Sequence, residues 1–186
     1  MIETLKFYKD FPKEGINFID IIPFLQSKRA FREVVEALKK ATTAPNVAAP
    51  EARAFLFTAP LLSEEGIVEN IIPMRKSGKL PFNDGDLIEV CIVKEYGFDK
   101  LYYRLSDIAA GVPEGDTFYV TILDDVLATG GTALGIAESL EKLTIHRDGK
   151  PYKVKVKEFV FLVEIEEING KERLEKIAPV TSLMSI

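Results

Sequence analysis

Apolar residues recur along the chain with two different periods, and the alternation of these periods predicts an α/β fold. Helical spacing predicts a helix that begins at Ser27 and ends before Pro45. Its apolar face consists of Phe31, Val34, Val35, Leu38 and Ala41. Short apolar runs typical of buried strands are NVAA, VENIIPM, DTFYVTIL and KVKVKEFVFLVEI. Strands alternating with helices predict a central, mainly parallel sheet flanked by helices and joined by right-handed crossovers.

Further elements follow from shorter patterns. The segment ARAFLFTAPLLSEEG predicts a helix that bends near Pro60 and is closed by Gly66. The segment DLIEVCIVKEYGFDKLYYRL predicts two strands joined at residues 96–99, preceded by the polar turn PFNDGD. We expect a helix after DDVLATGGTA that continues through Leu143, and a short helix in GKERLEKI.

Residues 1–25 differ from the rest because aromatic and turn-forming residues crowd together there. We expect this segment to lack regular secondary structure and to pack as a cap on an α/β core formed by residues 26–186. The chain has no internal repeat, so residues 1–186 are predicted to form a single domain.

Composition and charge exclude several classes of protein. With 47% hydrophobic residues the chain is too apolar to be disordered, and a net charge of −5 disfavours a broad nucleic-acid-binding face. No apolar run approaches the roughly 18 residues of a membrane span, and the first residues lack a signal-peptide core. The single cysteine, Cys91, cannot form a disulfide within the chain, and we expect it to be buried. We therefore expect a cytoplasmic protein without a membrane or nucleic-acid partner.

The segment ILDDVLATGGTA carries the strongest chemical signal. A strand delivers the carboxylates of Asp124 and Asp125 to the sheet edge, where they can accept hydrogen bonds from sugar hydroxyls. Glycines and a helix N-terminus follow, and their N–H groups favour a phosphate. No lysine follows the glycines, so the loop is not a Walker loop, and the GxGxxG spacing of a dinucleotide loop is absent. The pattern predicts a sugar-phosphate site.

A strand, two acids, TGGT and a helix together resemble the type I phosphoribosyltransferases. The motifs DFPKEGINFIDIIPFL, EARAFLFTAPL, MRKSGKLP, EYGFDKL and DDVLATGGTA follow the order and spacing of the adenine phosphoribosyltransferases within that family. The resemblance implies the type I phosphoribosyltransferase fold, with residues 1–25 as a hood and a flexible lid hairpin around residues 80–94. It also implies the transfer of phosphoribosyl from 5-phosphoribosyl 1-diphosphate to adenine, which yields AMP and diphosphate, by a homodimer.

Site residues are carried over from the resemblance, motif by motif. The substrate-binding set for phosphoribosyl diphosphate or AMP is Asp124, Asp125, Ala128, Thr129, Gly130, Gly131 and Thr132. The diphosphate-binding set is Arg53, Arg75, Lys76 and Lys79, with Arg75 as a candidate to act across a dimer interface. Glu95 matches the catalytic acid near N7 of the base, and Phe18 and Ile19 lie in the base-binding motif. The resemblance also implies a cis peptide bond between Glu51 and Ala52.

Magnesium is the implied cofactor. We expect Mg²⁺ to arrive bound to the anionic phosphoribosyl diphosphate, because the sequence offers no cluster of metal ligands.

Two positions depart from the family pattern: Ile19 stands where the hood commonly has arginine, and Ala54 stands where the diphosphate loop commonly has glycine. Two alternatives remain at this point. One is a phosphoribosyltransferase for another purine base, such as hypoxanthine or guanine. The other is a non-catalytic regulator that senses phosphoribosyl diphosphate.

Overall fold

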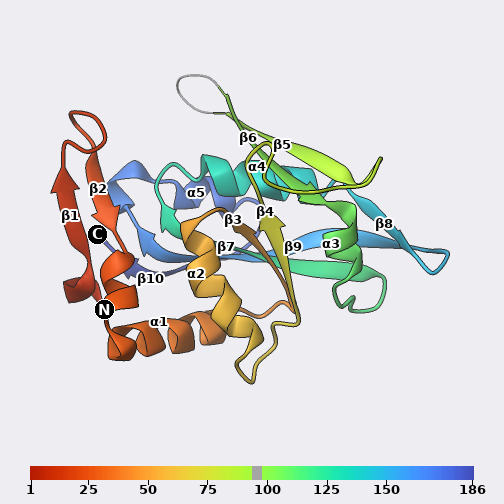
Figure 1. Cartoon of the computed structure of the whole chain (residues 1–186), viewed down its shortest axis with the longest axis horizontal. Coiled ribbons are helices and arrows are strands. Elements are labelled where there is room, and N and C mark those ends of the chain that lie inside the picture. The colour runs from red at the N-terminus through yellow and green to blue at the C-terminus, as the bar shows by residue number, and fades with distance from the viewer. Residues whose placement is uncertain (94–97) are drawn as a thin grey trace.

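A mainly parallel sheet lies at the centre of the computed structural model, which describes residues 1–93 and 98–186 (Figure 1). Five parallel strands run in the spatial order β10-β9-β7-β3-β4, and β8 pairs antiparallel with β9. Their bounds are β3 (Asn46–Pro50), β4 (Asn70–Met74), β7 (Thr117–Leu127), β8 (Thr144–Arg147), β9 (Lys150–Glu164) and β10 (Val180–Ser185). The predicted α/β class and parallel sheet are confirmed.

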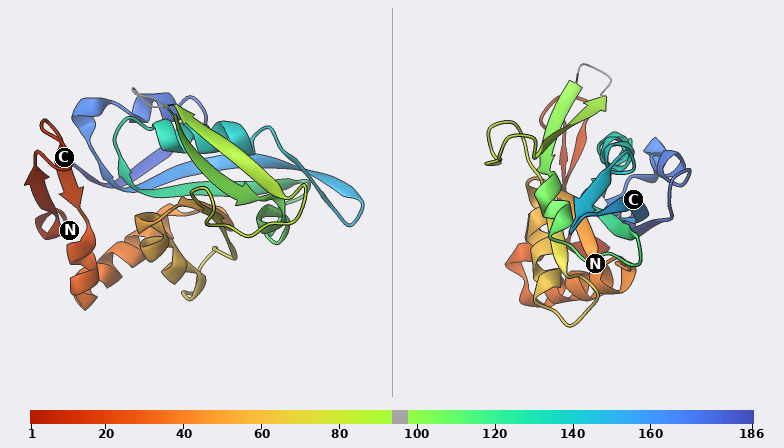
Figure 2. Two further views of the ribbon diagram at one scale, coloured as in Figure 1. Left: turned by 45° about the horizontal axis from the view of Figure 1, so that its top comes forward. Right: turned by 90° about the vertical axis from the view of Figure 1, so that its right-hand side faces the viewer.

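Helices cover both faces of this sheet (Figure 2). One face carries α1 (Lys28–Ala41), α2 (Arg53–Thr58) and the 3-10 turn η3 (Ala59–Leu62), and the opposite face carries α4 (Gly131–Leu140) and α5 (Lys171–Leu174). A hydrophobic core lies on each face of the sheet, and neighbouring residues of a strand point alternately into one core and the other, as the period of a strand requires. Val47 and Leu123 pack toward α1, whereas Ala48 and Ile122 pack toward α4.

The helix boundaries agree with the sequence at α1 and differ at two other helices. Ser27 caps α1 through a hydrogen bond from Ala30 N to Ser27 Oγ, as its position before the apolar face predicts. The predicted helix breaks near Pro60 as expected, because α2 ends at Thr58 and η3 follows with Pro60 in its first turn, but its predicted end at Gly66 is wrong, since η3 stops at Leu62. Similarly, α4 ends at Leu140 rather than at Leu143.

The N-terminal segment contains regular structure, contrary to the expectation from its sequence. It forms η1 (Ile2–Thr4), an antiparallel hairpin of β1 (Lys6–Lys9) and β2 (Asn17–Asp20), and η2 (Ile22–Gln26). The connecting turn holds the two strands in register, since the carboxylate of Asp10 accepts a hydrogen bond from Gly15 N at 2.8 Å. Ile21 and Phe24 are fully buried in the core with α1, so the segment packs on the body of the protein.

A second hairpin, of β5 (Leu87–Val93) and β6 (Phe98–Arg104), contains the two strands predicted there. Val90 and Ile92 are buried against α4, and Tyr103 Oη lies 2.9 Å from Ser139 Oγ on that helix. Burial raises the pKa of Tyr103 to about 12. The prediction that Cys91 is buried is wrong, because its side chain points away from that packed face and is exposed.

Residues 81–86, before this hairpin, belong to the predicted lid. Asp86 is anchored at their end, because its carboxylate accepts hydrogen bonds from Ser106 N at 2.8 Å and Ser106 Oγ at 2.7 Å. The free part of the segment is therefore shorter than the sequence suggests, and its motion stays a prediction.

Besides the elements of the N-terminal segment, α3 (Leu105–Ala109), β8 and β10 were not predicted. The hairpin of β8 and β9 turns at Asp148 and Gly149, both with positive φ, which is the Asp-Gly signal of a two-residue turn. The last 3-10 turn, η4 (Glu166–Ile168), leads into α5.

Candidate active site

The phosphate loop lies at the carboxyl end of β7, close to the centre of the sheet. β7 runs further than its apolar sequence predicts, so that Asp124 and Asp125 belong to the strand itself. The chain then turns through residues 128–130 and enters α4, with Gly130 at φ 72° as its N-terminal cap. Only glycine adopts this φ without cost, which explains its place in the motif.

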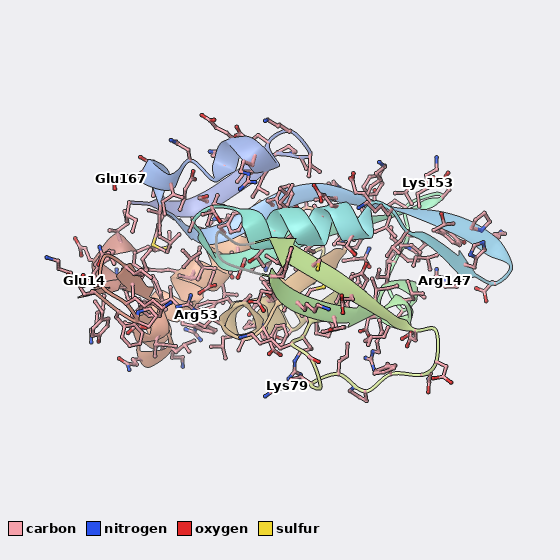
Figure 3. The ribbon with its side chains drawn as sticks, turned by 90° about the horizontal axis from the view of Figure 1, so that it is seen from above. Glu14, Arg53, Lys79, Arg147, Lys153 and Glu167 are labelled. Atoms are coloured by element: carbon pink, nitrogen blue, oxygen red, sulfur yellow. The ribbon has the colours of Figure 1, made fainter. Side chains whose placement is uncertain are left out.

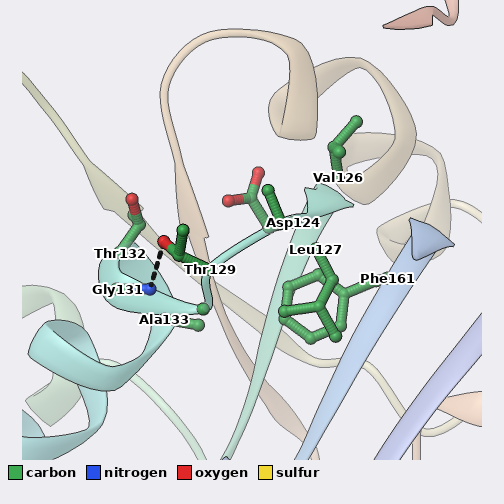
Figure 4. Close-up of a pocket in the computed structure, with 10 residues that line it drawn as sticks. Asp124, Val126, Leu127, Thr129, Gly131, Thr132, Ala133 and Phe161 are labelled. Carbon is green, nitrogen blue, oxygen red and sulfur yellow. Dashed lines mark hydrogen bonds between the residues drawn. The ribbon is translucent and has the colours of Figure 1, made fainter. Parts of the chain in front are cut away.

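One cavity brings the predicted substrate-binding loop together (Figure 4). Its lining includes Asp124, Ala128, Thr129, Gly130, Gly131 and Thr132. The first N–H groups of α4 have no acceptors within the helix, and Gly131 N donates to Thr129 Oγ1 of this loop at 3.4 Å. A phosphate in the cavity would therefore meet backbone N–H donors, the hydroxyls of two threonines and the positive end of a helix.

Gly170, at the start of α5, supports the phosphate loop from behind. A Cβ atom at Gly170 would lie 2.0 Å from Ala128 O and 2.8 Å from Thr129 C, so no side chain fits there. Arg173 NH1 also donates a hydrogen bond to Thr129 O at 3.4 Å. The C-terminal segment thus fixes the loop, although nothing in GKERLEKI identified this role beforehand.

A second cavity adjoins the first and combines cations with carboxylates. From the predicted set it contains Arg53, Lys76, Asp124, Asp125 and Thr132. The remaining lining residues are Pro50, Glu51, Ala52, Ile92, Asp99 and Leu101, which come from β3, the loop before α2 and the β5–β6 hairpin. A sugar diphosphate needs hydroxyl acceptors beside cations, and this cavity offers both.

Arg53, the first residue of α2, makes an ion pair across this cavity. Its Nε lies 2.6 Å from Oδ2 of the buried Asp125. Arg53 NH1 also donates to Ile19 O at 3.3 Å, and its Cζ lies 5.2 Å from the ring centroid of Phe18. Figure 3 shows Arg53 beside the N-terminal hairpin.

The carboxyl of Asp124 is a weaker acid than an ordinary aspartate. Burial raises the pKa of its carboxyl well above the ordinary range, and the neighbouring Asp125 carboxylate raises it further. Asp124 Oδ1 accepts a hydrogen bond from Asp125 N at 2.8 Å, which fixes its orientation at the strand end.

The other predicted diphosphate ligands do not line the second cavity. Arg75 donates to the carboxylate of Glu51, and its Cζ lies 5.9 Å from the ring centroid of Phe55. Lys79 is exposed in the loop after β4 and does not line the second cavity (Figure 3). The peptide bond between Glu51 and Ala52 is cis, so this implication of the resemblance is confirmed.

The N-terminal hairpin contributes an aromatic groove. It is lined by Tyr8, Phe11, Phe18 and Asp20, and the rings of Phe11 and Phe18 meet edge to face at 5.2 Å. The side chain of Ile19 points to the opposite face of the hairpin, where it is 4% exposed within the core. Only the backbone of Ile19 can therefore reach a ligand in this groove.

Glu95, the predicted catalytic residue, lies outside the described residues. Within residues 1–93 and 98–186, no group of three or more His, Cys, Asp or Glu side chains is placed to hold a metal ion.

Ala54 is buried in α2 and does not line either cavity, so its methyl group leaves the site open. In the described part of the chain, no helix has the length and apolar character needed to cross a membrane.

Sequence reasoning missed several residues that line or support the site. Tyr8 could have been found from the alternation of β1, had the segment been treated as a strand, whereas Phe11 lies in the turn after that strand. Glu51 and Asp99 carried no signal, because single carboxylates next to turns are common on any surface.

Comparison with known proteins adds independent evidence. No protein-family model matches the chain. The adenine phosphoribosyltransferase of Methanococcus maripaludis is 36% identical over 176 residues, which cover 93% of this chain and 91% of the relative. That of Maridesulfovibrio salexigens is 37% identical over 180 residues, or 95% and 94% of the two chains.

Solved structures of adenine phosphoribosyltransferases also match this chain. The crystal structure of adenine phosphoribosyltransferase from Thermoanaerobacter pseudethanolicus matches with a TM-score of 0.80 and 36% identity, over 100% of this chain and 97% of that one. The Saccharomyces cerevisiae enzyme, solved with adenine and an imino-sugar bisphosphate, matches with a TM-score of 0.78 and 29% identity, over 98% and 95%.

A parallel sheet that ends in two aspartates and a glycine phosphate loop, covered by helices on both faces, is the fold of the type I phosphoribosyltransferases. Since relatives of that name match at more than a third identity over nearly all of both chains, the chain belongs to the adenine phosphoribosyltransferase family.

Proposed function

We propose that the protein transfers the 5-phosphoribosyl group from 5-phosphoribosyl 1-diphosphate to N9 of adenine, forming AMP and releasing diphosphate. The observation that carries this proposal is the cavity where Arg53 and Lys76 face Asp124, Asp125 and Thr132. Cations, hydroxyl acceptors and the phosphate loop thus lie within reach of one sugar diphosphate. Family membership supports adenine as the base.

The phosphate loop holds the 5′-phosphate in this proposal. Backbone N–H groups at the start of α4 and the hydroxyls of Thr129 and Thr132 donate to its oxygens. Asp124 and Asp125 accept hydrogen bonds from the ribose hydroxyls, and the raised pKa of Asp124 suits an acid that shares protons with a hydroxyl.

Positive charge near the departing diphosphate is needed to stabilise it. As its bond to C1 of the ribose lengthens, negative charge gathers on the diphosphate and positive charge on the sugar ring. Arg53 and Lys76 stabilise the first, and the aspartates lie where they stabilise the second. Arg75 and Lys79 are placed further out and would reach the diphosphate only from the rim.

Magnesium would be delivered with the substrate. Phosphoribosyl diphosphate binds Mg²⁺ through its own oxygens, and waters complete the coordination shell. Oδ2 of Asp125 pairs with Arg53 Nε at 2.6 Å, so it would accept a ribose hydroxyl or a metal-bound water only in place of that pair. When bound, the ion neutralises the leaving group.

The aromatic groove of the N-terminal hairpin would bind the base. Phe18 offers a ring for stacking, and Tyr8 and Phe11 extend the apolar surface. In this proposal adenine reacts as the tautomer protonated at N7, and Glu95 shares and then takes up that proton while N9 forms the new bond to C1 of the ribose.

The proposed setting is the cytoplasm, where the exposed, unpaired Cys91 would remain reduced. A homodimer is the proposed assembly.

One experiment tests the proposed function. The protein is incubated with phosphoribosyl diphosphate and Mg²⁺ and, in separate reactions, adenine, hypoxanthine or guanine, and nucleotides are resolved by chromatography. We expect AMP from adenine and little product from the other bases. Product from hypoxanthine or guanine instead would reassign the base, and binding without any product would favour a regulator.

A further inference from the structure

The β5–β6 hairpin forms one wall of the second cavity, and α4 lies against this hairpin (Figure 1). Ile92, Asp99 and Leu101 of the hairpin line the second cavity. Of the described hairpin residues, none lines the first cavity, which contains the phosphate loop. The phosphate loop leads directly into α4, so this one helix touches both the cradle for a phosphate and the wall of the neighbouring cavity.

Gly135 is the point where α4 and the hairpin approach each other most tightly for lack of a side chain. A Cβ atom at Gly135 would lie 3.2 Å from Cys91 O and 3.5 Å from Ile92 Cγ1. The first distance is shorter than ordinary van der Waals contact, so the hairpin would have to move by a few tenths of an ångström. One turn further along the same helix face, Ser139 Oγ lies 2.9 Å from Tyr103 Oη of the hairpin.

A second attachment holds the hairpin on the side of the main sheet. Arg75 N donates a hydrogen bond to Tyr102 O at 2.8 Å, and Tyr102 N donates to Arg75 O at 2.7 Å. Arg75 directly precedes Lys76, the lysine that lines the second cavity. The hairpin is therefore held between α4 and the end of β4, and a displacement from α4 changes the cavity that these elements enclose.

We propose that Gly135 is a positioning residue for the transfer reaction: it lets the hairpin lie close to α4 and so sets the distance between the phosphate loop and the cavity wall of Ile92, Asp99 and Leu101. This inference rests on the proposed function. There the phosphate loop holds the 5′ end of the substrate, and the second cavity holds the end where the bond to C1 breaks. Turnover depends on the alignment of the reacting groups more steeply than binding of the distant phosphate does.

Gly135→Ala tests this role by adding one methyl group at the contact. We expect turnover with adenine to fall by about three- to tenfold, because the wall moves away from the phosphate loop. Ribose 5-phosphate binds through the first cavity, so its dissociation constant, measured by isothermal titration calorimetry, should change by less than about twofold. Gly135→Val adds a larger group and should lower turnover further than Gly135→Ala does.

Glu138→Ala is the matched control. Glu138 is exposed on α4, and its replacement by alanine favours the helix without adding atoms next to the hairpin. This variant should keep the turnover of the unmodified protein. Thermal denaturation of all variants separates the two roles, since a merely structural glycine would change the melting temperature and leave the turnover of the folded protein unchanged.

Unchanged turnover in Gly135→Ala would overturn the inference. A parallel loss of affinity for ribose 5-phosphate would also overturn it, because the disturbance would then lie in α4 and the phosphate loop. If Gly135→Val fails to fold by circular dichroism, Gly135→Ala decides the outcome. Failure of the proposed function is distinguishable, because the unmodified protein would then form no AMP from adenine.

Discussion

At the scale of single residues, two adjacent carboxylates make the folded protein less stable at neutral pH. Asp124 and Asp125 follow each other on β7, and the first carries a raised pKa because it is partly buried beside the second. A carboxyl whose pKa is higher in the folded than in the unfolded chain favours folding at low pH. That contribution is lost as the pH rises through its folded pKa.

Asp124→Asn should therefore stabilise the protein at neutral pH. The amide cannot ionise, so the cost of a buried charge next to Asp125 disappears. We expect the melting temperature to rise by several degrees at pH 7.5 and to change little at pH 4, with weaker binding of phosphoribosyl diphosphate. Thermal denaturation followed by circular dichroism across this range measures the effect. An equal shift at both pH values would contradict the assignment.

Glu95→Gln tests the chemistry separately from binding. The amide keeps the volume of the side chain but cannot give or take a proton, so turnover with adenine should fall by about 10²–10⁴-fold. Affinity for phosphoribosyl diphosphate should hardly change, whereas Asp125→Asn should weaken that affinity and spare the groove for the base. Steady-state kinetics and calorimetry on both variants check this pair of effects. Near-normal turnover of Glu95→Gln would remove the residue from the mechanism.

At the scale of elements, the phosphate loop depends on a neighbour that is distant in sequence. Gly170 approaches Ala128 and Thr129 so closely that a Cβ atom would overlap them.

Gly170→Ala should displace the loop, lower the free energy of unfolding by about 1–3 kcal/mol and weaken the binding of phosphoribosyl diphosphate. Gly66→Ala is the matched control, since a Cβ atom there makes only ordinary contacts, 3.5 Å from Lys39 Cε. Urea denaturation and calorimetry measure the two effects. Unchanged affinity in Gly170→Ala would show that the loop needs no such support.

A second connection joins α1 to the sheet far from the site. Glu158 accepts hydrogen bonds from Thr43 Oγ1 at 2.8 Å and from Thr121 Oγ1 at 2.7 Å, next to an irregularity in the pairing of β7 with β9.

Glu158→Ala would leave the buried Thr121 hydroxyl without its acceptor and should lower the free energy of unfolding by about 1–3 kcal/mol. The Michaelis constants should stay the same, because no atom of this network lines either cavity. Urea denaturation and initial rates provide the check, and a changed Michaelis constant would refute the separation.

Strong local patterns predicted much of these elements, and the misses have physical causes. Three patterns were sufficient to predict their elements: the helical period of α1, the apolar run of β7 and the motif that follows β7. Burial dictates both the period and the composition of such segments. The hairpin of β1 and β2 was missed because aromatic and turn-forming residues obscure its alternation. The contacts of Gly170 and the pairing of Arg53 with Asp125 join residues far apart in sequence, and no local pattern encodes such encounters.

At the scale of the whole molecule, apolar side chains remain exposed on one side of the body. Ile22 and Leu25 on η2, Leu56 on α2 and Leu62 on η3 are each more than a third exposed. Exposed apolar area of this kind is covered in many oligomers.

Light scattering after size exclusion should therefore give about twice the 20.8 kDa of one chain. Leu56→Glu should weaken the dimer at least about tenfold, because a charge would be buried on association. Val112→Ser, at an exposed position in the loop after α3, should leave the mass unchanged. A mass of one chain for the unmodified protein would contradict the dimer.

The support that Gly170 gives to the phosphate loop also bears on synthesis by the ribosome. The loop emerges well before α5 and β10, and β10 pairs with β9 only after α5 has been made. A nascent chain in which TGGT has left the ribosome but Gly170 has not lacks the residue that supports the phosphate loop from behind. The phosphate loop therefore gains this support only after α5 has been synthesised.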